Sequence, residues 1–250
     1  FFFESMPHMA IRFHALLVLQ AFLLSCGAAR VAPSSGVAER RVDLSPGLWV
    51  EPTAGRLGFR AWVCLDEGWL EQVVCSPGTR EHESLMVTDV PASSIHAGLL
   101  LLGLEPGRPG RWREEGTTVV AIPPAGPELS VSVVWSEDDG TSRSGAIDSW
   151  IVDVREQIDY PTDRWVFAGS IELQGEEAAR AGTGYLADRS GSIIGLVTFG
   201  DELLAAVDVI PDAASVRAPE WIAASAGMPP VGTRVTVVLR IVEPGQTAAE

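Results

Sequence analysis

Most of the residues in this chain that could do chemistry lie in one stretch, between Cys75 and Gly107. Beyond the N-terminal segment the chain has two histidines, His82 and His96, and two cysteines, Cys64 and Cys75. Both imidazoles and one thiol therefore belong to the same stretch. Imidazole, thiolate and carboxylate groups are the usual protein ligands of zinc and other transition metals. The stretch is thus the first place to look for a site.

A metal site is the sharpest hypothesis for this stretch. Glu83 follows His82 directly, and His96 lies in the first turn of a predicted helix. We therefore predict that His82, Glu83 and His96 bind a transition metal such as zinc. Cys75 would lie beside this ion. Arg80 and Glu81 would orient the ligands without binding the metal themselves.

Two other interpretations of the same residues are open. A Cys75 thiolate with His82 or His96 as its base would make the cluster the site of a thiol-dependent enzyme, and a bound metal would allow a metal-dependent one. Alternatively, the motif is a polar network that only ties a helix to a sheet and stabilises the fold. The leading hypothesis is a ligand- or metal-binding module, not an enzyme. The sequence identifies no ligand, reaction, or protein or small-molecule partner.

Short apolar runs between turn residues predict strands through most of the chain. The runs are 59–64, 70–75, 84–88, 117–122, 129–135, 165–168, 192–199 and 234–242. One buried helix is predicted over about 93–103, because Ser93 and Ser94 can cap its start, Gly103 can end it, and four consecutive leucines leave it no polar face. Shorter helices are expected near 146–152 and 219–226. The predicted fold is a strand-dominated single domain of the α+β class, with the 93–103 helix packed on an antiparallel sheet.

The two cysteines are expected to stay unpaired if a predicted hairpin is correct. Strands over 57–64 and 69–75 would be joined by a turn at 66–68, with Cys64 near the turn and Cys75 at the far end. About six residues at ~3.3 Å each would then separate the thiols, whereas a disulfide needs its Cα atoms within about 7 Å.

The N-terminal segment resembles an export signal. An apolar run over 15–24 is too short to cross a bilayer as a helix and ends in Leu-Leu-Ser-Cys26-Gly, which is similar to a bacterial lipobox. We expect a signal peptide over 1–26, a lipid on Cys26, a tether over 27–44, a domain over 45–243 and a disordered tail over 244–250. Cleavage a few residues later, without a lipid, is the alternative. The predicted location is the cell envelope or periplasm, with the membrane contacted through the lipid anchor.

Composition argues against nucleic-acid binding. The net charge is −15, and the 18 basic residues are all arginine and are scattered along the sequence. A chain of this kind has no basic patch that could replace the counterions of phosphates.

Several separated motifs resemble one family, the YdjY-like domain of exported bacterial proteins and lipoproteins. They are Cys75, Arg80-Glu81-His82-Glu83-Ser84, Ser94-Ile95-His96-Ala97, Leu99–Gly103, Trp165–Ser170, Tyr185–Asp188 with Gly191, and Pro229–Thr233. The resemblance covers about 45–243 and implies no defined activity. Some members carry ferredoxin-like labels, but an iron–sulfur cluster is not expected here, because a cubane needs four thiolates and two remain after Cys26.

Overall fold

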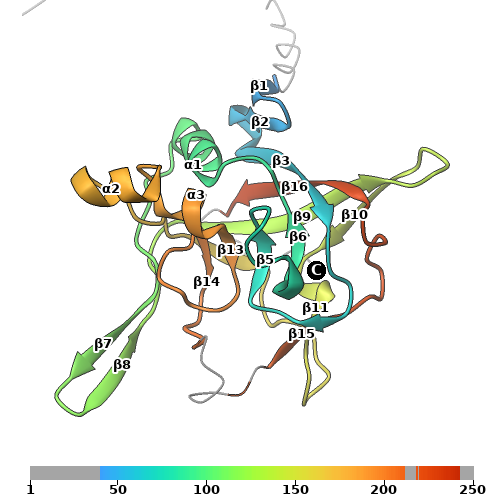
Figure 1. Cartoon of the computed structure of the whole chain (residues 1–250). Coiled ribbons are helices and arrows are strands. Elements are labelled where there is room, and N and C mark those ends of the chain that lie inside the picture. Colours follow the sequence, from blue (N-terminus) through green and yellow to red (C-terminus); the bar gives the residue numbers. More distant parts are fainter. Residues whose placement is uncertain (1–39, 212–217, 219, 243–250) are drawn as a thin grey trace, which may run out of the picture. The chain divides into compact units, whose positions relative to one another are not determined.

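Eight strands close into a barrel in the computed structural model, which describes residues 40–211, 218 and 220–242 (Figure 1). Around the barrel the strands follow the order β3, β16, β9, β12, β14, β13, β5 and β6, and β6 returns to β3. Their bounds in that order are Arg56–Val63, Arg234–Ile241, Glu128–Ser136, Arg164–Phe167, Leu204–Ala206, Ser192–Gly195, Gln72–Cys75 and Ser84–Val87. Each of the eight runs predicted as strands overlaps one of these elements or, for 117–122, strand β8 of a separate hairpin, whereas β14 was not predicted.

The barrel overturns the predicted fold class. Helices make up only about 16% of the structure, and eight strands close on themselves instead of forming an open sheet against which one helix packs. Closure rests on two residue pairs between β3 and β6, Trp62 with Val87 and Val63 with Met86. The sheet is also not purely antiparallel, because β5 runs parallel to β6 and β13 runs parallel to β14. Apolar periodicity predicts single strands, but which edges meet depends on the whole chain.

The barrel interior is filled by alternate residues of neighbouring strands. Phe59 of β3 lies opposite Val237 of β16, and Val237 lies opposite Val133 of β9. All three side chains are fully buried. This two-residue period is the one expected of strands with one face in a core. The core is formed by side chains between residues 44 and 241, so the chain from residue 40 onward contains it completely.

Three further strands extend the barrel sheet, and two small sheets lie outside it. β1 (Val42–Ser45) pairs with β2 (Leu48–Glu51), β2 pairs with β3, and β10 (Ser142–Ala146) forms a hairpin with β9. A turn at residues 138–140 joins that hairpin. One small sheet orders β11 (Ile151–Asp153), β15 (Trp221–Ala223) and β4 (Gly68–Trp69), and the other pairs β7 (Arg111–Glu115) with β8 (Thr118–Ile122).

The predicted central helix exists, but one of its sides is open to solvent. α1 (Ala92–Leu101) contacts β2, β3 and α3 (Leu186–Ser190) and buries Ile95 and Leu99. Leu101, in contrast, is 62% exposed. A run of leucines thus did not imply a fully buried helix. Where a helix was expected near 146–152, the chain forms a short 3₁₀ turn followed by β11, and where one was expected near 219–226 it forms strand β15. Two helices, α2 (Gly175–Ala181) and α3, were not predicted.

The hairpin predicted around residues 66–68 is wrong. β4, which follows the turn, pairs with β15, whereas β5 pairs with β13 and β6. The residues of a turn act only locally. Here the distant strand β15, and not a strand adjacent in sequence, pairs with β4. Cys64 and Cys75 are nevertheless both free thiols.

The predicted signal peptide, most of the tether and the tail lie outside the described residues. Strand β1 begins at Val42, within the last residues of the predicted tether. None of the helices in the described ranges is both long enough and apolar enough to span a membrane.

Candidate functional site

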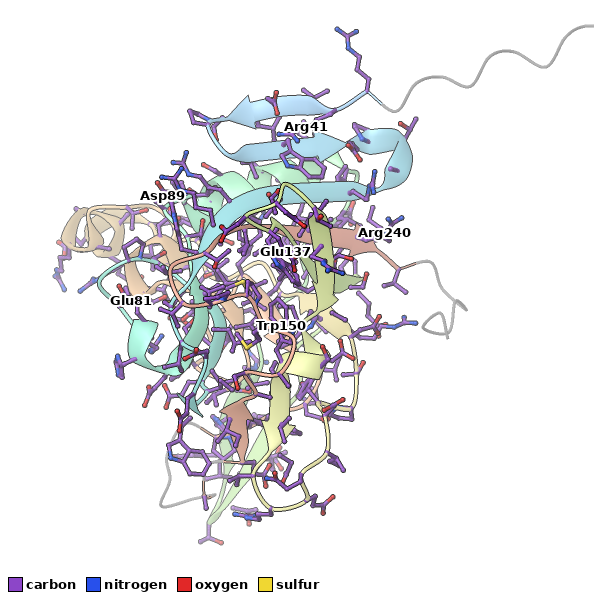
Figure 2. All side chains as sticks on the ribbon, turned by 90° about the vertical axis from the view of Figure 1, so that its right-hand side faces the viewer. Arg41, Glu81, Asp89, Glu137, Trp150 and Arg240 are labelled. Carbon is purple, nitrogen blue, oxygen red and sulfur yellow. The ribbon has the colours of Figure 1, made fainter. Side chains whose placement is uncertain are left out.

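The motif between Cys75 and Gly107 begins with residues 76–83, which form the loop that joins β5 to β6. Its backbone and side chains are held mainly by one another: Thr79 donates to the carbonyl of Ser76 at 2.7 Å, and Glu81 accepts from the N–H of Gly78. This second bond is the main reason that the pKa of Glu81 lies below its usual value. Ser76 also donates its N–H to the carbonyl of Gly191 at 3.1 Å, which ties the loop to the start of β13. Figure 2 labels Glu81 at the edge of the molecule.

Arg80 attaches this loop to the segment between β13 and β14. Its guanidinium donates to the hydroxyl of Ser192 at 3.1 Å and lies 3.8 Å above the ring of Phe199. A guanidinium over an aromatic face is stabilising by roughly 0.5–2 kcal/mol, depending on solvent access. The hydroxyl it bonds is fully buried. Arg80 therefore acts as a structural clamp, whereas the sequence suggested that it would orient metal ligands.

His82 and Glu83 lie next to each other on the exposed side of the loop. The His82 side chain is 73% exposed, and its Nε2 atom is 3.7 Å from a carboxylate oxygen of Glu83. The segment Glu81–Glu83 is a 3₁₀ turn, so neighbouring side chains are not directed to opposite faces as they would be in a strand. Two of the three predicted ligands are thus close together on the surface.

His96 belongs to a different environment, between α1 and the segments that follow β12. Its Nδ1 atom lies 2.8 Å from the phenol oxygen of Tyr185, and the Tyr185 hydroxyl donates to the carbonyl of Gly169 at 2.9 Å. Because the phenol proton goes to that carbonyl, the phenol oxygen accepts from Nδ1–H. Burial lowers the pKa of His96, while the nearby Glu172 charge acts in the opposite direction. The ring also meets Phe167 edge to face.

Across the described ranges, no three histidine, cysteine, aspartate or glutamate side chains lie close enough together to hold a metal ion. His82 and Glu83 share one surface, but His96 is engaged by Tyr185, and Glu81 by Gly78. The three predicted ligands are therefore not grouped as a site in this structure.

The two thiols both contact Ser84, and Cys75 is buried whereas Cys64 is half-buried. Cys64 donates to the carbonyl of Ser84 at 3.1 Å, and Cys75 is fully buried next to the Ser84 side chain. Burial raises the pKa of the Cys64 thiol to about 12, and it also raises that of Cys75. A thiol with a raised pKa is a poor nucleophile at neutral pH. This environment is unlike that of a catalytic cysteine.

Residues that were quoted only for the family resemblance provide contacts that hold α1 and α3. Asp188 accepts the N–H of Ser93 at 2.9 Å, which satisfies a free donor at the start of the helix. Ser170, in the left-handed region at φ 52°, donates to the carbonyl of Asp201 at 2.6 Å and accepts the N–H of Ala187. The sequence did contain a signal for these contacts, because the motifs at 165–170 and 185–188 occur together with the Ile95-His96-Ala97 motif of α1.

A polar hollow of about 380 Å³ lies beside the start of α1. It is lined by Ser76, Pro77, Thr88, Asp89, Val90, Pro91, Thr183 and Asp188. Its two carboxylates are already engaged, Asp89 by a bidentate pair with Arg60 at 2.6 Å and Asp188 by Ser93. Both acids therefore have a hydrogen-bond partner within the fold, and only that of Asp89 is a cation.

Comparison with known proteins finds a family whose matched region contains the motifs described above. No curated protein and no solved structure is detectably similar to the chain. A family model, the YdjY domain, matches residues 49–240, which include the whole barrel except its last residue. The match covers well over half of the sequence, and the protein therefore belongs to the YdjY domain family.

Proposed function

We propose that this YdjY domain is a non-catalytic interaction domain of the cell envelope, in which the motif between Cys75 and Gly107 holds the fold together. The observation that carries the proposal is the bond chain from His96 through Tyr185 to Gly169, at 2.8 and 2.9 Å. The Nδ1 atom is thereby committed to a buried phenol, and no group of three metal-ligating side chains within the described residues includes the other ring nitrogen.

The other polar groups of the motif support the same proposal. Arg80 is used by Ser192 and Phe199, and Glu81 by the loop backbone. The thiol-dependent alternative is weakened by the raised pKa of both cysteines. A hydrogen-bonded group inside a fold contributes about 0.5–1.5 kcal/mol, and several such bonds together account for a motif without any reaction.

Export and anchoring are part of this proposal and rest on the sequence. The apolar run over 15–24 and the lipobox-like end at Cys26 would deliver the chain to the envelope and attach it to a membrane by a lipid. The barrel would then face its partner in the periplasm or outside the cell.

Elemental analysis tests the proposal against the metal-binding alternative. The chain from residue 40 onward is purified without chelator, titrated with zinc, and compared with a His82→Ala/His96→Ala double variant. The proposal expects less than about one-tenth of an equivalent of metal in both proteins and no tight zinc uptake by the wild type. Near-stoichiometric metal in the wild type, and none in a folded double variant, would overturn it and make the protein a metalloprotein.

A further inference from the structure

Strands β7 and β8 form a two-stranded arm that projects from the barrel (Figure 1). The arm begins where Arg108 and Ala125 exchange backbone hydrogen bonds at 2.7 and 3.0 Å, and it reverses at Gly116 and Thr117. All residues of β7 are exposed, and so are most residues of β8. In the described part of the chain, no third strand pairs with the arm.

An isolated hairpin of this kind is marginally stable in water, and this one also exposes apolar side chains. Val119 is 58% exposed, and Trp112 lies diagonally across the same face, because Val119 pairs with Glu114 and Ala121 with Trp112. Residues 117–122 read Thr-Thr-Val-Val-Ala-Ile and contain no charge, proline or glycine. Such segments pair readily with further strands.

The two free edges of the arm differ in chemistry. The β7 edge carries Arg111, Arg113, Glu114 and Glu115, and charges of this density protect an edge strand from pairing. The β8 edge, Thr118–Ile122, has no charged residue. A partner strand would therefore add to β8.

We propose that the β8 edge pairs antiparallel with the β8 edge of a second copy of this chain, about a two-fold axis at Val120. In this register Val120 faces Val120 of the second copy, and Val119 faces Ala121 in both directions. With Glu115 and Thr118 closing the turn, alternation along the ladder leaves the N–H and C=O groups of Val119 and Ala121 directed away from β7. These groups meet in the proposed pair and complete a four-stranded sheet from two arms.

Charge favours this part of the chain as the contact between two copies. The whole chain carries −15, so most of its surface repels a second copy. Residues 108–125 carry three arginines and two glutamates, so this segment does not share the negative charge of the whole chain. The two-fold arrangement also closes after two chains, which is the commonest form of self-association. The proposal goes beyond the interaction role of the domain and does not depend on the role of the motif.

Sedimentation equilibrium of the chain from residue 40 onward, over a wide range of concentration, tests the proposal. The wild type is expected to form dimers. Val120→Lys places two like charges opposite each other at the axis and should weaken association roughly tenfold or more. Val120→Glu should do the same, whereas an equal mixture of the two variants should form heterodimers, because a lysine then faces a glutamate.

Val231→Lys provides the matched control. Val231 is 52% exposed and lies outside the arm, so this variant has the same change of charge and should dimerise like the wild type. Circular dichroism confirms that each variant is folded. A wild type that stays monomeric, a Val120→Lys variant that dimerises as well as the wild type, or variants that fail to restore each other in the mixture would each overturn the proposal.

Discussion

The Nδ1 atom of His96 and the phenol oxygen of Tyr185 lie 2.8 Å apart and join two motifs that are 89 residues apart in the chain. Tyr185 passes the connection on to the carbonyl of Gly169, just after β12. The phenol is almost fully buried, so water cannot replace it at either bond. One hydroxyl therefore links α1, the turn before α3 and the end of a barrel strand.

Removing that hydroxyl should destabilise the fold measurably. Tyr185→Phe keeps the ring but leaves the Gly169 carbonyl and the His96 N–H without their partner, and the expected loss in the free energy of unfolding is about 1–3 kcal/mol. His82→Ala should change the same quantity by less than about 0.5 kcal/mol, because that side chain is mostly in solvent. Urea denaturation measures both. Equal effects of the two substitutions would contradict the structural role of His96 and Tyr185.

The contribution of His96 to the stability of the fold should fall as the pH drops below the ordinary histidine range. Burial lowers the pKa of His96 in the folded state, so the unfolded chain binds a proton more readily. The stabilisation is therefore present above about pH 6.5 and is lost as the pH falls from there through the folded-state pKa. The slope from this one group is at most about 1.4 kcal/mol per pH unit.

His96→Gln isolates this contribution, because the amide can still donate to Tyr185 but does not titrate. Thermal unfolding of both proteins between about pH 7.5 and pH 5 should show a steeper loss in the wild type. Parallel curves would mean that His96 is not the group responsible.

Local features of the fold could be predicted from the sequence, whereas pairing could not. Strands with alternating apolar residues, such as Phe59 and Ala61 in β3, were predicted correctly because burial of one face leaves that pattern. The pairing of Trp62 with Val87 that closes the barrel leaves no comparable pattern in the sequence, because every strand edge offers the same backbone N–H and C=O groups. The same reason explains the wrong hairpin at residues 66–68.

The candidate site shows a similar division. Its stretch was identified because rare histidines and cysteines are visible in a sequence. Nearness in sequence then suggested that His82 and His96 share a site, although the partner of His96 is Tyr185, far along the chain. Tyr185 was noticed only as part of a motif. A histidine with a buried hydroxyl partner and one with an exposed neighbour cannot be distinguished by residue type.

The thiols should be unreactive until the protein unfolds. Burial raises the pKa of Cys64 to about 12 and raises that of Cys75 as well, so very little thiolate is present at neutral pH. Iodoacetamide should label neither residue in the native protein over hours at about pH 7.5, and should label both in denaturant. Fast labelling of Cys75 in the native state would revive the thiol-dependent enzyme.

Glu202 should make the fold less stable at high pH than at low pH. Its side chain is fully buried, one carboxylate oxygen accepts the N–H groups of Phe199 and Gly200, and the other has no hydrogen-bond partner within the described residues. Burial raises its pKa in the folded state, and the charge of Asp201 adds to the effect. The protonated carboxyl is thus favoured by folding. Its stabilising contribution is present below the unfolded pKa and is lost as the pH rises through the folded pKa.

Glu202→Gln tests this argument directly. The amide oxygen can still accept from Phe199 and Gly200, but the side chain no longer has to ionise in a buried position. The variant should match the wild type near pH 4 and exceed its melting temperature near pH 8, roughly the two sides of a raised carboxyl pKa. His96 is present in both proteins, so its own titration cancels in the difference. A variant that is destabilised equally at both pH values would mean that the carboxylate is ionised in place and that its second oxygen has a partner, such as a water molecule, which the amide cannot keep.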